Sequence, residues 1–235
     1  VFSYRLDSSG NVSTTPNDQP LTIRNWQDEV YNTSVSNNVG VSFSDGNDKG
    51  NYYISAGVSD QQGIVKSSSF NTADLRLNLN YKLSEKSKIT ARMSAFVSNS
   101  DFSAGGDKIG GDRNFIQQLV SFRPLVNNDP DIIIDDNDLG VGNPLTFIED
   151  FTDETSENRI FASIAYQHDF NIQGLQYEFR VGGNLRSKNR ERFFGTSTWQ
   201  GSNVGGLLQK MTLNALTYQV NNLLRYNRRF NNKHR

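Results

Sequence analysis

The chain has 235 residues and a formal net charge of −1, so it is long enough for one large domain or two small ones and lacks the basic excess typical of nucleic-acid binders. It contains no cysteine, which excludes disulfides, thiolate metal sites and cysteine nucleophiles. No apolar run reaches the length of a transmembrane helix, whereas the short, half-polar strands of a membrane β-barrel stay compatible with the sequence.

Residues 1–34 are predicted to be a loop region, because they are polar and show turn signals at 7–11 and 16–20. Within this region, residues 25–31 could form a short helix. The chain opens without a signal peptide and stops in a predicted turn, so we expect it to be a piece of a longer protein.

From residue 35 onward, apolar and polar residues alternate, which places the apolar side chains on one face of each strand. The clearest case is 75–83, where apolar residues alternate with Arg76, Asn78, Asn80 and Lys82. Strands are predicted at about 39–43, 51–60, 75–83 and 89–98, with connections at 45–50, 61–71 and 84–87.

A long insertion at about 99–157 separates these strands from the later ones. Within it, residues 114–120 fit two helical turns that end before Pro124, and an acidic, turn-rich stretch follows. Further strands are predicted at 160–168, 175–181 and 213–230, with a tight turn at 171–174 and a second long loop at 188–212.

Short and long connections alternate along the chain, which puts all tight turns at one end of an antiparallel sheet and all long loops at the other. This arrangement is typical of outer-membrane barrels, whereas a soluble sandwich has mixed loops at both ends. We therefore predict an all-β fold, an antiparallel transmembrane β-barrel segment over residues 35–235. The alternative is a soluble β-rich binding or structural domain of a cell-surface protein, in which the apolar faces would pack into a two-sheet core.

A family resemblance covers residues 24–98. It is carried by Asn25-Trp26-Gln27-Asp28-Glu29-Val30-Tyr31, Asn51-Tyr52-Tyr53-Ile54-Ser55-Ala56-Gly57, Asp60-Gln61-Gln62-Gly63-Ile64-Val65-Lys66 and Leu75-Arg76-Leu77-Asn78-Leu79. Together these closely resemble the first part of the barrel in SusC/RagA-type TonB-dependent outer-membrane transporters. Residues 113–126, with Phe122-Arg123-Pro124-Leu125-Val126, are similar to a short helix of the same family.

The resemblance implies about seven strands of a 22-stranded barrel in the cell outer membrane, with residues 1–34 as an extracellular loop region. It implies import of oligosaccharides or peptides under a SusD-like surface lipoprotein, driven by TonB through a plug and a contact segment outside this chain. The implied partners are this lipoprotein, TonB, outer-membrane lipid and the ligand. No nucleic acid, cofactor or enzyme activity is expected.

Two tryptophans are candidates for substrate contact. Trp26 and Trp199 both fall on the long-loop side of the predicted topology, and an indole ring can stack on the apolar face of a sugar. Tryptophan also forms the interfacial belts of barrels and packs within loops, which is the alternative for both residues.

The sequence shows no arrangement of residues typical of a catalytic or metal-binding site. His168 and His234 are the only histidines and lie far apart in sequence. The acidic stretch Asp129–Asp138 could bind Ca²⁺ or form a solvated loop, but its spacing is not that of a known site. A basic group could meet lipopolysaccharide phosphates or an acidic substrate, or form a solvated rim; it consists of Arg186, Lys188, Arg190 and Arg192.

Overall fold

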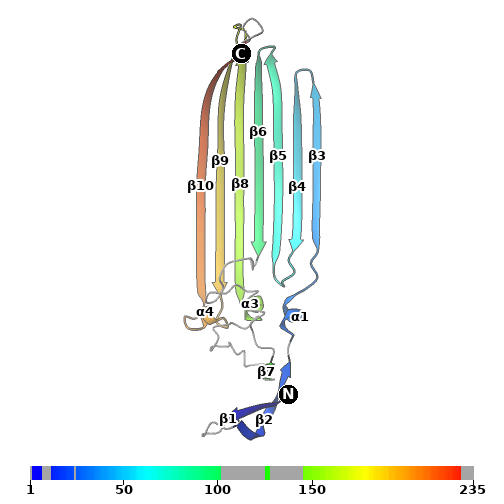
Figure 1. Cartoon of the computed structure of the whole chain (residues 1–235), viewed down its shortest axis with the longest axis vertical. Coiled ribbons are helices and arrows are strands. Elements are labelled where there is room, and N and C mark those ends of the chain that lie inside the picture. Colours follow the sequence, from blue (N-terminus) through cyan, green and yellow to red (C-terminus); the bar gives the residue numbers. More distant parts are fainter. Residues whose placement is uncertain (1, 7–11, 24, 102–124, 128–144, 229–235) are drawn as a thin grey trace.

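The computed structural model describes residues 2–6, 12–23, 25–101, 125–127 and 145–228, and its main feature is one antiparallel sheet (Figure 1). Seven strands form it in the order β10-β9-β8-β6-β5-β4-β3. Their bounds are Ser36–Asn47 (β3), Gly50–Gln62 (β4), Ser69–Ser84 (β5), Ser87–Asp101 (β6), Phe151–Asp169 (β8), Leu175–Phe194 (β9) and Leu207–Tyr226 (β10). A second sheet has the order β1-β2-β7 and consists of Phe2–Leu6 (β1), Val12–Ile23 (β2) and Leu125–Asn127 (β7).

All tight turns of the large sheet lie at one end, as the loop lengths predicted (Figure 1). This turn end holds the connections 48–49, 85–86 and 170–174. The opposite end, which we call the mouth, holds the longer connections 63–68, 102–150 and 195–206.

The register of the large sheet is continuous across its strands. Leu77 lies opposite Met93, Met93 opposite Ala162, Ala162 opposite Gly183, and Gly183 opposite Tyr218. Because side chains alternate along a strand, this register defines two faces. The outward face carries the odd-numbered residues of β3, β5, β6 and β9 and the even-numbered residues of β4, β8 and β10; the inward face carries the others.

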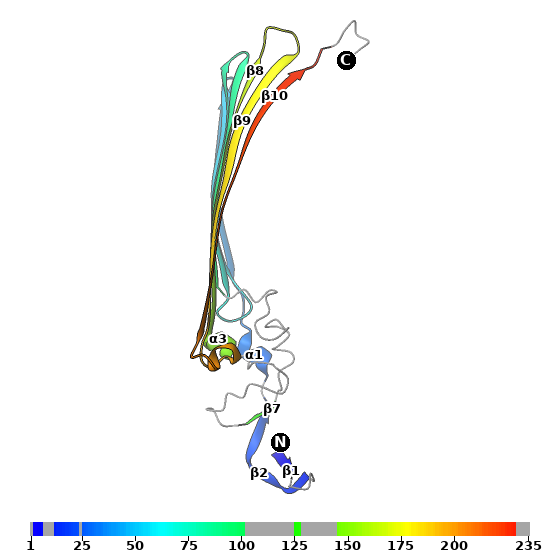
Figure 2. The same cartoon turned by 90° about the vertical axis from the view of Figure 1, so that its left-hand side faces the viewer.

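The apolar side chains of the outward face are exposed rather than packed against a second sheet. Val39, Val41, Leu216 and Tyr218 are each at least 69% exposed. The sheet bends toward the side on which α1 lies, so the inward face is the concave one (Figure 2). These observations match a piece of barrel wall and not the two-sheet core of the soluble alternative.

The helices of the described chain are short and lie at the mouth: Trp26–Val30 (α1), Thr146–Glu149 (α3) and Trp199–Ser202 (α4). The small core of the molecule lies beside them and consists of Trp26, Val30, Val65, Phe151 and Phe194. The helix predicted at 25–31 is therefore confirmed. Within the described residues, no helix is long and apolar enough to cross a membrane.

The strands extend further toward the mouth than predicted. β9 continues to Phe194 and β10 begins at Leu207, so the predicted loop at 188–212 shrinks to 195–206. The predicted insertion at 99–157 likewise shrinks to 102–150. The cause is that polar residues occupy both faces of β8 at 152–159 and of β9 at 186–192, so the apolar alternation that marks a strand fades there.

Residues 1–34 also differ from the expected irregular loop, because β1 and β2 form an antiparallel pair within them. The helix predicted at 114–120 and the acidic stretch Asp129–Asp138 lie outside the described residues.

Candidate functional site

The outward face changes from apolar to polar along one line that crosses the sheet. Ile160 of β8 lies opposite Leu185 of β9, which lies opposite Leu216 of β10, and these three residues mark the edge of the continuous apolar stretch. Phe193 of β9 and Leu208 of β10 are separate apolar residues of the outward face nearer the mouth. The next outward residues toward the mouth are polar: Asn158, Ser187 and Asn214. The line continues on the neighbouring strands between Val97 and Asn99 and between Ala73 and Asn71.

The apolar outward residues between this line and the turn end form what we call the band. In β5 it runs from about 73 to 83, and a strand of that length tilted as in a barrel spans about 25 Å. Five charged residues of the outward face lie on the mouth side of this line: Asp60, Asp101, Glu154, Glu191 and Lys210. The sixth, Asp45, lies near the turn that ends β3, in register with Tyr52. A band of this height and composition fits the hydrocarbon layer of a membrane.

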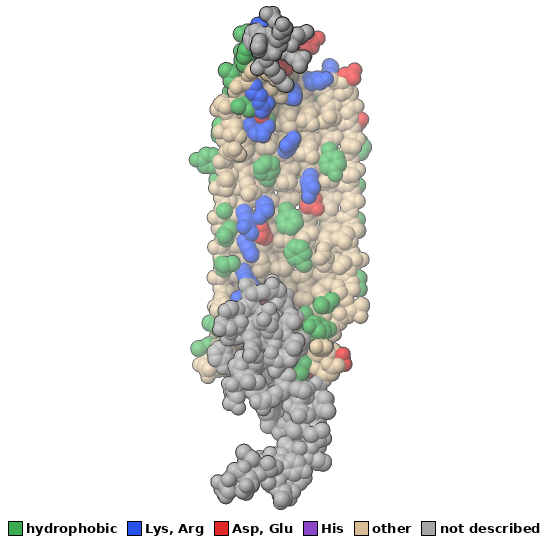
Figure 3. Space-filling model, viewed as in Figure 1, with side chains coloured by type: hydrophobic (Ala, Val, Ile, Leu, Met, Phe, Trp, Pro, Cys, Tyr) green, Lys and Arg blue, Asp and Glu red, His purple; other side chains and the backbone are tan. Residues whose placement is uncertain are grey.

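The inward face has the opposite composition and is strongly basic. Its cations follow one another from the turn end to the mouth and form a column of Lys and Arg side chains (Figure 3). The inward cations are Arg76, Lys82, Lys88, Arg92, Arg159, Arg180, Arg186, Lys188, Arg190, Arg192 and Arg225. The inward carboxylates are fewer: Asp74, Asp153, Glu157, Asp169 and Glu178.

Glu157 organises the cations nearest the band at the mouth. Its oxygens accept from Arg186 Nε at 2.8 Å and Nη2 at 2.9 Å, and from Arg159 Nη2 at 3.2 Å. Lys188 lies directly opposite it in the register. The hydrogen bond from Arg186, together with the positive charges of Arg186, Arg159 and Lys188, lowers the pKa of Glu157 despite its burial. The carboxylate therefore stays charged.

Asp153 has the same role four residues closer to the mouth on β8. It is 2% exposed and accepts from Arg190 Nε at 2.7 Å and Nη2 at 2.6 Å, and from Arg192 Nε at 3.3 Å. A buried carboxylate needs such charge-assisted partners, and the fork of an arginine provides two parallel ones. The two carboxylates thus hold four arginines in defined positions on the inward wall.

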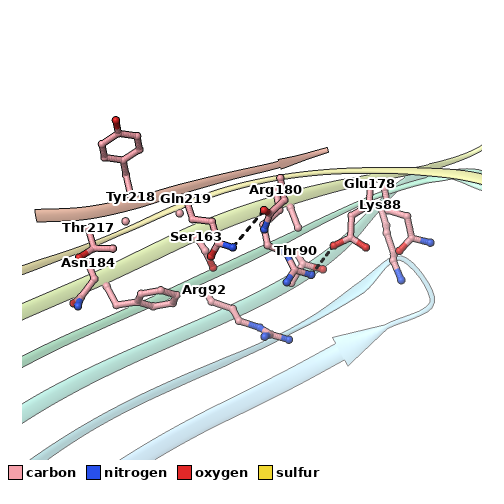
Figure 4. A pocket seen from close by; sticks show the side chains of 16 residues that line it. Lys88, Thr90, Arg92, Ser163, Glu178, Arg180, Asn184, Thr217, Tyr218 and Gln219 are labelled. Atoms are coloured by element: carbon pink, nitrogen blue, oxygen red, sulfur yellow. Dashed lines mark hydrogen bonds and ion pairs between the residues drawn. The ribbon is translucent and has the colours of Figure 1, made fainter. Parts of the chain in front are cut away.

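A hollow lies on the inward face of β6, β8, β9 and β10, closer to the turn end (Figure 4). Its volume is about 370 Å³, and its small residues include Ser163 and Gly182. A Cβ on Gly182 would lie 3.0 Å from the Ser163 Cβ, so the close approach of the strands favours glycine. Lys88, Arg92, Glu178 and Arg180 surround these residues, whereas Tyr218 points to the other side of the sheet (Figure 4).

The structure places the two predicted substrate-contact residues at the mouth. The side chain of Trp26 is 4% exposed and belongs to the small core, which agrees with the loop-packing alternative for this residue. Trp199 begins α4, and its side chain lies outside the described part of the structure. Substrate contact by either residue stays a prediction.

The remaining sequence-based candidates divide by face. Arg186, Lys188, Arg190 and Arg192 all point inward, away from the side on which lipopolysaccharide would lie. Their spacing of two residues was the signal that they share one strand face. Asp153 and Glu157 were missed because they fell within the predicted insertion. His168 contacts Ser87 and Tyr166, and no group of three or more potential ligands for a metal occurs in the described residues.

Comparisons with known proteins agree with this geometry, although no family model matches the chain. The chain is 26% identical to TonB-dependent receptor P3 of Formosa agariphila over 212 residues, which is 87% of the chain and 21% of the receptor. It is 25% identical to TonB-dependent receptor P39 of the same organism over 239 residues, covering 97% of the chain and 21% of the receptor. The chain therefore spans about a fifth of the length of these curated relatives.

Among solved structures, the RagAB peptide importer in its closed-closed state superposes with a TM-score of 0.68 and 17% identity, over 89% of this chain and 24% of that chain. A second structure of the RagAB peptide transporter gives a TM-score of 0.63 at 17% identity, over 86% and 23% of the two chains. At this identity the likeness concerns the fold. The chain is thus a segment of antiparallel β-barrel wall similar to TonB-dependent receptors, and the SusC/RagA-type resemblance seen in residues 24–98 is confirmed.

Proposed function

We propose that this chain belongs to the wall of a TonB-dependent importer in the cell outer membrane, which takes up oligosaccharides or peptides. The observation that carries the proposal is the contrast between the two sheet faces. The outward face has an uncharged apolar band of about 25 Å, and the inward face has Lys and Arg side chains along its length. A wall between lipid and a water-filled passage needs this combination.

The chain contributes lumen wall and the mouth of the barrel in this proposal. Ligand capture takes place under a SusD-like surface lipoprotein, and TonB supplies the energy through regions of the protein outside this chain. Outer-membrane lipid covers the band. The protein acts as a transporter and not as an enzyme, and it uses no cofactor and no nucleic acid. The names of the curated relatives support the transport class, since both are TonB-dependent receptors.

The soluble alternative, a β-rich binding or structural domain of a cell-surface protein, lacks support from a specific observation. It would require the apolar residues of the band to be covered by a second layer. Leu216 and Tyr218 instead stay 70% and 78% exposed. An apolar surface of this extent on a soluble domain would promote aggregation.

Uptake by the full-length transporter tests the proposal. Cells that contain the protein and its neighbouring surface lipoprotein should accumulate labelled oligosaccharides or peptides, and the accumulation should stop when TonB is deleted or the membrane potential is collapsed. Fractionation should find the protein with the outer membrane. Failure to accumulate any probe from broad glycan and peptide panels, in cells that hold the folded protein in that membrane, would contradict the import function.

A further inference from the structure

On the inward face of the large sheet, cations outnumber carboxylates. Eleven Lys and Arg side chains face inward and only five Asp and Glu side chains do, by the strand register. The outward face of the same strands has five carboxylates and one cation, Lys210. Since the chain as a whole has a net charge of −1, the excess is a property of this face and not of the composition.

The excess is concentrated where a ligand would first meet the wall. Around Glu157, one carboxylate faces three cations: Arg159, Arg186 and Lys188. Arg159 and Arg186 lie directly opposite each other in the register, a like-charge pair that costs stability unless an anion lies between them. Glu157 is that anion, but it provides one negative charge for three neighbouring cations.

The cations at the mouth keep donors for a further anion. A guanidinium has five N–H groups, and Arg186 uses its Nε and one Nη on Glu157. Arg159 uses one Nη on the same carboxylate, and its side chain is 47% exposed. Because Arg186 donates to both oxygens of Glu157, Arg159 can turn to another carboxylate without leaving Glu157 unpaired.

The basic surface continues from the mouth toward the turn end. Arg186 and Arg180 are six residues apart on β9, about 20 Å along an extended strand. Arg92 lies between these levels, because it is opposite Ser163, which is opposite Gly182. The hollow near the turn end is lined by Arg92 together with Lys88 and Arg180. Inward cations thus recur at intervals that an oligomer with charged groups on successive units could bridge.

We propose that this wall selects anionic oligomers, chains with carboxylate or sulfate groups, and that Arg159, Arg186 and Lys188 form the first anion-binding position at the mouth. The inference rests on the import function proposed above and names the chemical class of its ligand. The guanidinium fork matches both carboxylate and sulfate geometry, so glycans and peptides with such groups share the same recognition. Inward-facing aromatic residues beside Arg159, Phe96 and Phe161, offer apolar contact to the backbone of the oligomer.

Binding by the purified full-length transporter tests this selectivity with three matched pairs of probes. Each pair differs in charge alone: oligogalacturonate and its methyl ester, dextran sulfate and dextran, and oligoglutamate and oligoglutamine. We expect a charged probe to bind at least about tenfold more tightly than its neutral counterpart, and the preference to fall as salt is added. The pair that shows the preference tells whether the anion comes from a uronate, a sulfated glycan or a peptide.

The double variant Arg159→Gln, Lys188→Gln locates the site, because it leaves the bond between Arg186 and Glu157 in place. It should weaken binding of the charged probe about tenfold and leave the neutral probe unchanged. The control is Lys210→Gln, which removes a cation of the outward face that pairs with Glu191. The Lys210→Gln variant should leave the binding of both the charged and the neutral probe unchanged.

Equal binding within all three pairs, or no binding of any charged probe, overturns the anionic selectivity. An equal loss in the Lys210→Gln control would mean that the charge effect does not come from the inward wall, and it also overturns the proposal. If the cations instead pair with a protein segment outside this chain, the double variant lowers the unfolding temperature without changing the charge preference, and the proposed anion position is rejected. TonB-dependent uptake of a neutral probe alone would leave the import function standing and reject this inference, whereas absence of any uptake rejects the import function itself.

Discussion

The two halves of the long strands are built from the same chain but are stabilised by different interactions. Toward the turn end, the apolar residues of the band cover one face and a polar wall covers the other. Toward the mouth, polar residues predominate on both faces of β8 and β9, and buried carboxylates with arginine partners replace the band. The band half therefore depends on lipid, whereas the mouth half has to be stable in water.

The mouth half also contains the only described cluster of buried apolar residues. Val65, Phe151 and Phe194 from strand ends and connections meet Trp26 and Val30 of α1 there. A loop that must keep its shape above a membrane needs such a core, since no lipid covers it. The difference between the halves implies that single substitutions can disrupt one half and leave the other intact.

The largest effect is expected from Phe194→Ala. The ring of Phe194 is 3% exposed and its centroid lies 4.8 Å from that of Phe151, so truncation leaves a cavity in the small core. Loss of a buried phenylalanine costs about 3–5 kcal/mol. Hydrogen exchange and limited proteolysis should show the mouth opening while the band half stays protected. The control, Phe193→Ala, removes an outward ring that is 40% exposed, and it should leave protection unchanged. Equal loss of protection in both halves would contradict separate stability.

The second effect concerns the band. Leu79→Arg places a charge near its middle on the outward face, at a cost of about 2–4 kcal/mol for an arginine at the bilayer midplane. The full-length protein should reach the outer membrane in smaller amounts and lose its heat-modifiable mobility on gels. Asn78→Arg is the matched control, because the neighbouring residue points inward. If both variants assembled equally well, Leu79 would not face lipid.

The sequence predicted the band half much better than the mouth half, and the reason is physical. Lipid on one side and water on the other force a period of two, so 75–83 and 89–98 could be assigned as strands. Where water contacts both sides of the sheet, as in 186–192, polar residues occupy both faces and the pattern is lost. The pairing of Asp153 with Arg190 depends on the register between β8 and β9, which the spacing within one strand does not contain.

The resemblance located the chain within a barrel, but it did not identify the candidate site. The basic wall becomes visible only when the inward residues of all strands are placed side by side, because each strand contributes only a few charged residues. For Trp26, the residue type suggested ligand contact. Its neighbours in α1 and β8 instead make it a member of the core.

A smaller effect is expected from Asp153→Asn. Asp153 is 2% exposed, and its carboxylate accepts hydrogen bonds from Arg190 and Arg192, whose side chains are 17% and 16% exposed. Replacing it by a neutral amide weakens charge-assisted hydrogen bonds in a shielded place, which costs about 2 kcal/mol. The unfolding temperature of the mouth, followed by hydrogen exchange, should fall. Glu191→Gln should change this unfolding temperature little, because both side chains of the Glu191–Lys210 ion pair are exposed. A larger effect of Glu191→Gln would mean that burial does not determine which pair matters.

The smallest effect is a dependence of mouth stability on pH through Glu157. The hydrogen bond from Arg186 lowers the pKa of this carboxyl in the folded protein, so the unfolded chain binds its proton more readily. The stabilisation is therefore complete above the ordinary pKa of a glutamate and is lost as the pH falls through the lowered value. Wild type should unfold a few degrees above Glu157→Gln at pH 7, and the difference should shrink as the pH falls below the ordinary pKa of a glutamate. A difference that does not change with pH would mean that Glu157 acts through its shape and not through its charge, and the anion between Arg159 and Arg186 would then not be what holds these two cations together.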